Sequence, residues 1–188
     1  MSKLFAIFTI LLVAFISLVS LNYSIKRSDE SIHSVVAQEM AVFEGTLIKP
    51  TFFGTTYLNK PPLQIFLTSR LIKLLGDENF VYRIIPALCG IGSAILLILI
   101  SNSYFGSLIP GVFAVLCMAS GRQIFFDHGI RVGVQDSALL FGVLLTIFGF
   151  VREKNFLIIL GIFIGTSVKT NEEIVLWVAD LFFFYKKI

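Results

Sequence analysis

The chain has 188 residues, of which 56% are hydrophobic and only 14% are charged, and its formal net charge is +3. A typical soluble domain carries about 25% charged residues, so this composition predicts an integral membrane protein whose first partners are membrane lipids. The sequence contains no basic tract with interleaved aromatic residues. Nucleic acid is therefore excluded as an expected partner.

Apolar runs separated by short polar segments follow one another along the chain. They predict an all-α, polytopic transmembrane bundle of about six spans in a single domain, residues 1–188. The first run is longer than the roughly 7–15 apolar residues of a signal peptide, so we interpret it as a retained span. The last two runs are shorter than the roughly 20 residues that cross a bilayer, which leaves tilted or re-entrant segments open. The expected spans are residues 4–21, 80–101, 108–126, 137–151, 156–168 and 174–185.

The longest polar section, residues 22–79, is expected to form an outer loop with two amphipathic helices that lie in the membrane interface. The first helix covers residues 29–43. The second begins at the proline pair 61–62, because proline suits the first helical turn, and ends at Gly76. Residues 49–57 between them indicate extended chain and turns. The expected apolar stripes are Ile32, Val35, Val36, Met40 and Phe43 in the first helix, and Leu63, Phe66, Leu67, Leu71 and Leu74 in the second.

The placement of lysine and arginine predicts the orientation of the chain in the membrane. With Lys3 and the N-terminus in the cytoplasm, the basic turn at residues 152–155 also lies inside. Residues 22–79, 127–136 and 169–173 then share the opposite face. The sequence thus predicts a multi-pass protein of the cell (inner) membrane with a polar, active face on the extracytoplasmic side.

This outer face combines several cations with a few carboxylates. Cationic side chains suit a phosphate or diphosphate, and a carboxylate accepts a proton from an attacking hydroxyl or amine. The apolar runs beside them suit a lipid tail. The titratable residues expected on this face are Asp29, Glu30, His33, Lys60, Arg83, Asp127, His128, Arg131, Asp136, Lys169, Glu172 and Glu173.

Each of these residues also has a purely structural interpretation. Asp29 and Glu30 suit the first turn of a helix, where acids are favoured. Lys60 can extend its charge to the membrane interface, and the arginines can pair with lipid headgroups. His33 lies on the same helix face as Glu30, but one Glu/His pair is a weak metal signal, so a surface histidine is the expectation. Composition and spacing alone leave these alternatives open.

Several short motifs occur in a fixed order within residues 20–175. They are Asp29-Glu30, Lys60-Pro61-Pro62-Leu63, Arg83-Ile84-Ile85-Pro86-Ala87-Leu88, a loop with Arg131 and Asp136, and Gly165-Thr166-Ser167-Val168-Lys169. In this order the chain resembles the N-terminal half of GT-C membrane glycosyltransferases. The most similar branch contains the lipid A aminoarabinose transferases and the protein O-mannosyltransferases (dolichyl-phosphate-mannose-protein mannosyltransferases).

The resemblance implies transfer of a sugar from a polyprenyl-phosphate carrier to a lipid, glycan or protein acceptor at the outer membrane face. It implies that Asp29 activates or positions the acceptor, that Asp136 is a second acid at the same cavity, and that Lys60 contacts the carrier phosphate. The remaining residues implied to bind substrate are Glu30, Arg83, Arg131 and Lys169.

The chain departs from the pattern of this family in three places. Asn59 stands where the aminoarabinose enzymes tend to have an acid, which argues against a metal site there, although a divalent metal stays open and no other cofactor is implied. Thr170 replaces the usual glycine after Lys169. The family also has about twice the expected number of spans. The alternatives are therefore a non-catalytic membrane subunit, a split half completed by a second chain, a truncated remnant, or a small transporter, although transporter charges would sit nearer the midplane.

Overall fold

The computed structural model describes residues 2–25, 28–43, 49–127 and 129–169. It is a helical bundle with one small hairpin, which confirms the predicted helical architecture. The helices are α1 (Ser2–Leu18), α2 (Ser28–Val42), α3 (Leu63–Leu75), α4 (Val81–Phe105), α5 (Ile109–Ser120), the π-helix η1 (Gln123–Asp127), α6 (Asp136–Val151) and α7 (Asn155–Val168). The hairpin strands are β1 (Thr51–Phe52) and β2 (Thr55–Thr56).

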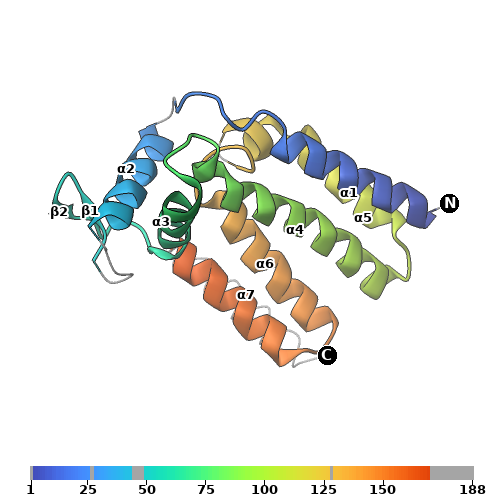
Figure 1. Cartoon of the computed structure of the whole chain (residues 1–188). Helices are drawn as coiled ribbons and strands as arrows, with labels where there is room; N and C mark the ends of the chain where they lie inside the picture. Colours follow the sequence, from blue (N-terminus) through green and yellow to red (C-terminus); the bar gives the residue numbers. More distant parts are fainter. Residues whose placement is uncertain (1, 26–27, 44–48, 128, 170–188) are drawn as a thin grey trace.

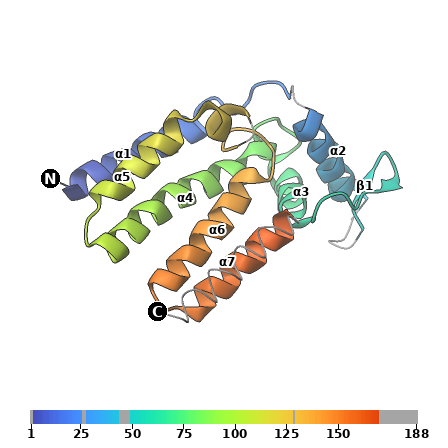
Figure 2. The ribbon, with the colours of Figure 1, turned by 180° about the vertical axis from the view of Figure 1, so that it is seen from behind.

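Five helices lie side by side as rods, and a smaller layer covers one end of them. The rods are α1, α5, α4, α6 and α7, with α4 packed between the α1/α5 pair and α6 (Figure 1). The end layer consists of α2, α3 and the hairpin, and the view from behind shows the same arrangement (Figure 2). The chain enters α4 and α6 at this end and leaves α7 there, so residues far apart in sequence meet under the end layer.

The expected apolar runs form helices wherever the structure describes them, but two boundaries were wrong. The helix of the second run continues through residues 102–105, which we expected to be a turn, because no breaker occurs before Gly106, which takes the left-handed conformation at φ 65°. The third run is interrupted at Gly121, whose backbone is extended, and residues 123–127 form the π-helix instead. The run at 174–185 lies outside the described residues.

Among the described helices, α4 alone is long and apolar enough to cross a membrane, with 25 residues and a hydropathy of 2.5. The other four rods are shorter apolar helices. The expected number of spans therefore remains a prediction.

The end layer has its own core between α2, α3 and the start of α4. Val36 and Met40 of α2 pack there against Tyr57 and Ile65. The hairpin closes through Phe53 and Gly54, which both have positive φ, as a type I′ turn requires. These elements match the predicted helix 29–43 and the predicted turns at 49–57.

Helix α3 turns a largely polar face toward the bundle. Its bounds agree with the expected helix apart from its start, which is Leu63 instead of the proline pair. Its buried residues, however, are Gln64, Ile65, Thr68 and Ser69. None of the five residues of the expected apolar stripe is buried, and two are exposed, Leu74 by 78% and Leu67 by 40%. A helix with an apolar outer face suits a membrane interface, and it turns polar groups toward the bundle end.

The closest helix contact joins α6 and α7 through glycines. A Cβ on Gly142 would lie 2.8 Å from the backbone nitrogen of Gly165, and a Cβ on Gly161 would lie 2.6 Å from the carbonyl oxygen of Gly142. Gly161 and Gly165 have the small-x-x-x-small spacing that lets membrane helices approach closely. This contact sets the path of α7 back to the end layer.

We expect Gly161→Ala to reduce stability by about 1–3 kcal/mol, because the new methyl group must push the α6 backbone away. Gly165→Ala is the matched control on the same helix, since a Cβ there meets only Leu139 Cδ1, at an ordinary 3.7 Å. Thermal unfolding of the purified protein in detergent measures both. Equal midpoints for the two variants would contradict the close packing.

Candidate functional site

A buried ion pair lies where α2, α4 and the loop before α6 meet. Arg83 Nε donates to Glu30 Oε1 at 2.7 Å, and Arg83 Nη2 donates to Glu30 Oε2 at 3.0 Å. The two side chains are 0% and 1% exposed. The backbone N–H of Gly133 donates to Glu30 Oε1 at 2.8 Å, so the carboxylate also holds the loop. Paired and hydrogen-bonded on both sides, the two charges satisfy the condition for burying them.

The same arginine holds the chain that leaves α1. Its Nη1 donates to the carbonyl oxygens of Leu21 and Tyr23, both at 2.6 Å. Its guanidinium also lies 3.5 Å from the centroid of the Tyr23 ring. The Tyr23 hydroxyl donates to the carbonyl of Arg131, whose side chain in turn donates to Val19 O at 2.7 Å. The contacts of Arg83 and Arg131 therefore join four segments of the chain.

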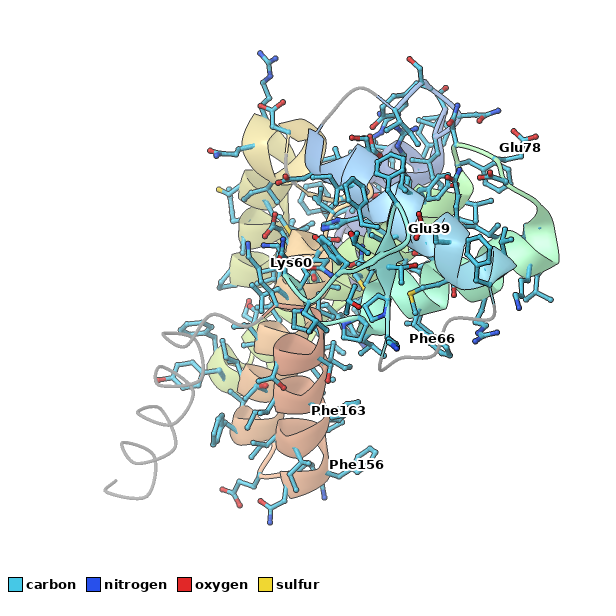
Figure 3. All side chains as sticks on the ribbon, turned by 90° about the vertical axis from the view of Figure 1, so that its left-hand side faces the viewer. Glu39, Lys60, Phe66, Glu78, Phe156 and Phe163 are labelled. Carbon is cyan, nitrogen blue, oxygen red and sulfur yellow. The ribbon has the colours of Figure 1, made fainter. Side chains whose placement is uncertain are left out.

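Three residues predicted for catalysis or phosphate binding, Asp29, Lys60 and Asp136, lie in segments that hydrogen bonds join at the covered end of the rods. They come from the first turn of α2, from the turn before α3 and from the first turn of α6. Figure 3 shows Lys60 at the covered end of the rods.

His33 itself is buried, which corrects the expectation of a surface histidine. It is 9% exposed, and its Nδ1 donates to the carbonyl of Gly133 at 3.4 Å. Burial is the main cause that lowers the pKa of His33, and Lys60 acts in the same direction, whereas the Gly133 contact, Asp29 and Asp136 act against it. The imidazole is thus held neutral between two carboxylates and a lysine.

Asp136 has a direct cationic partner. Lys169 Nζ, just past the end of α7, lies 2.5 Å from Asp136 Oδ1 at the start of α6, and the side chains are 26% and 37% exposed respectively. This pair is accessible, in contrast to the buried Glu30–Arg83 pair. It can therefore exchange partners with an incoming anion.

Tyr57 is a further group near Asp29. Burial raises the pKa of its hydroxyl, and the charge of Asp29 raises it further. The ring is 8% exposed and belongs to the end-layer core. Neither Tyr57 nor His33 was among the predicted site residues, although the sequence placed His33 on the same helix face as Glu30, three residues before it.

The structure separates the seven predicted site residues into two groups. Asp29, Lys60, Asp136 and Lys169 have exposed or half-exposed side chains at the covered end. Glu30 and Arg83 are enclosed and paired with each other, and Arg131 is bonded to the end of α1. In this conformation the second group supports the site, and its predicted contact with substrate remains untested.

No three His, Cys, Asp or Glu side chains within the described ranges are close enough to hold a metal ion. The carboxylate of Glu30, the residue after Asp29, is bound by Arg83.

Residues 59–185 match the family described as dolichyl-phosphate-mannose-protein mannosyltransferase. The chain belongs to this family. Membership confirms the resemblance to GT-C glycosyltransferases and makes the chain an integral membrane protein. The match begins at Asn59, so it includes Lys60, Asp136 and Lys169 but not α2.

A solved structure extends the similarity in fold to α2. ArnT from Cupriavidus metallidurans, in a crystal structure bound to undecaprenyl phosphate, matches 93% of this chain with a TM-score of 0.76 at 17% sequence identity. The chain spans 33% of that ArnT chain. A search of curated proteins finds no match. At this identity the ArnT likeness shows the fold alone.

Arg83→Met is expected to destabilise the protein by about 3–5 kcal/mol, because it leaves the Glu30 carboxylate buried without its cation. Arg152→Met, at an exposed arginine after α6, is the matched control and should change stability by less than about 0.5 kcal/mol. Thermal unfolding in detergent compares them. A small and equal effect of both variants would show that the buried pair does not hold the fold.

The lowered pKa of His33 predicts a pH dependence of stability. Below its ordinary value of 6.5, the unfolded chain binds a proton that the folded chain does not, so the free energy of unfolding decreases as the pH falls. Above 6.5 both states are neutral, and the histidine contributes no slope. Unfolding of wild type and His33→Gln between about pH 8 and pH 5 isolates this contribution. Parallel profiles would contradict the buried, neutral imidazole.

Proposed function

We propose that the chain forms the donor-phosphate and acceptor-activating face of a glycosyltransferase that uses a polyprenyl-phosphate sugar. The observation that carries this proposal is that the segments with Asp29, Lys60 and Asp136 meet at one end of the apolar bundle, where Gly133 N donates to Glu30 and Gln135 Nε2 donates to Pro61 O. Two carboxylates and two lysines at such a place combine proton acceptance with phosphate binding. The family match and the undecaprenyl phosphate bound to ArnT support the same class of donor.

The proposed reaction is an inverting displacement at the anomeric carbon. An acceptor hydroxyl or amine gives its proton to Asp29 as its oxygen or nitrogen bonds to that carbon. The bond between the carbon and the phosphate oxygen breaks, and its electron pair leaves with the polyprenyl phosphate. Lys60 stabilises the charge that develops on this leaving group, and Asp136 keeps Lys169 near it until the phosphate competes for that cation.

The orientation of the site follows from the same proposal. The polyprenyl tail lies against the apolar rods, and the exposed aromatic side chains of α7, such as Phe156 and Phe163, face outward along them (Figure 3). The covered end with α2 and α3 is the extracytoplasmic face of a multi-pass inner-membrane protein, and Lys3 at the opposite end is cytoplasmic.

Lys60→Gln and Asp29→Asn test the two roles separately. Binding of undecaprenyl phosphate to the chain in lipid nanodiscs should weaken roughly 10-fold or more in Lys60→Gln, since a charge-assisted contact is lost. Asp29→Asn should keep this binding and lower sugar transfer from a labelled polyprenyl-phosphate sugar in membranes about 100-fold or more.

Lys73→Gln and Glu78→Gln, at exposed charges of the same end layer, are the matched controls and should alter neither readout. Transfer that is equal in wild type and Asp29→Asn would remove Asp29 from the mechanism. Lipid binding without any transfer in wild type would favour a second candidate, a non-catalytic membrane subunit, whose basis is that the chain spans 33% of the ArnT chain.

A further inference from the structure

Two buried glutamines connect the turn that carries Lys60 to the loop that carries Asp136. Gln64 Nε2, in the first turn of α3, donates to the carbonyl of Val134 at 3.0 Å. Gln135 Nε2, in the loop, donates back to the carbonyl of Pro61 at 3.1 Å. Both side chains are 3% exposed. Because a carbonyl only accepts, the amide NH₂ group must face it in each case.

The two hydrogen bonds run in opposite directions between the same two segments. Sliding either segment along the other would break both bonds together, so the pair defines one register. The acceptor Pro61 directly follows Lys60, and the donor Gln135 directly precedes Asp136. The bonds therefore act on the backbone next to each proposed functional side chain.

The glutamines occupy positions where apolar side chains would be the simpler solution. Within the part of the chain that the structure describes, Gln64 Oε1 and Gln135 Oε1 are buried and have no hydrogen-bond partner. An unpaired buried carbonyl is unfavourable, so packing alone does not account for these residues. Their amide donors supply what an apolar side chain cannot, a directional contact to a chosen carbonyl.

The surroundings of Gln64 explain how its oxygen can be tolerated. It lines a small polar cavity with His33, Thr68, Tyr82 and Gly133 among others. The space open to the centre of a water-sized sphere is ≈ 10 Å³, enough for about one ordered water. A water bound there would donate to Gln64 Oε1.

We propose that Gln64 and Gln135 are positioning residues of the phosphate site, which set the distance between Lys60 and Asp136 through the backbone on either side. This inference rests on the proposed function, because it assumes that Lys60 binds the phosphate of the donor lipid. The inference adds to the proposed function that Gln135, from the opposite segment, holds Lys60 in place.

The test is a double-mutant cycle on binding of undecaprenyl phosphate in nanodiscs. Gln135→Met keeps the length of the side chain and removes the donor, and it should weaken binding about 2- to 12-fold, the equivalent of one hydrogen bond. In the Lys60→Gln background the same substitution should have less than about a twofold effect on binding. Gln135 acts on the phosphate only through Lys60, whose charge is absent in that background. Gln64→Met should behave in the same way and provides a second, independent variant.

Ser101→Ala is the matched control. Ser101 is 4% exposed and joins α4 to α5 at the opposite end of the rods, donating to Ser107 O at 2.7 Å and accepting from Gly111 N at 2.8 Å. It should lower the unfolding temperature without changing lipid binding. If Gln135→Met weakens binding equally in both backgrounds, or not at all, the positioning role is wrong. If Lys60→Gln leaves binding unchanged, the proposed function fails instead.

Discussion

The Glu30–Arg83 ion pair is the interaction on which the rest of this structure depends. Neither charge could be buried alone, because desolvation without a partner costs several kcal/mol. Together they also bind the Gly133 backbone and the chain that leaves α1. One pair therefore fixes α2, α4 and the loop before α6 relative to one another, and this places Asp29, adjacent to Glu30, at the same end as Asp136.

The two ion pairs have different roles, which follow from their burial. The buried Glu30–Arg83 pair holds the backbone in place. In the accessible Asp136–Lys169 pair, a charged ligand can replace one of the two partners. His33 is buried beside the same loop, where its Nδ1 donates to Gly133 O, and burial lowers its pKa. A membrane protein gathers such polar groups where its helices end, because the apolar interior offers no solvent for them.

Helix α3 connects the fold to the proposed site. It presents Gln64 and Thr68 inward beside Ile65, and Leu67 and Leu74 outward. Its polar inner face allows a hydrogen bond to the Asp136 loop. Its outer face suits the membrane interface. The turn with Lys60 is therefore joined through Pro61 and Gln64 to the loop that precedes Asp136.

The sequence by itself determined the helical membrane class, the five described apolar rods and both end-layer helices, because periodicity and breakers are local signals. The roles of Asp29, Lys60 and Asp136 stay predictions. The inward face of α3, the burial of His33 and the pairing of Glu30 with Arg83, 53 positions away, were decided by the tertiary structure alone. Amphipathic spacing shows that a helix has two faces, but which face is solvated or lipid-exposed depends on its neighbours. Likewise, the sequence alone does not show whether a charged residue in a motif binds a substrate or pairs with an oppositely charged residue. Only the packing of distant segments distinguishes these two roles.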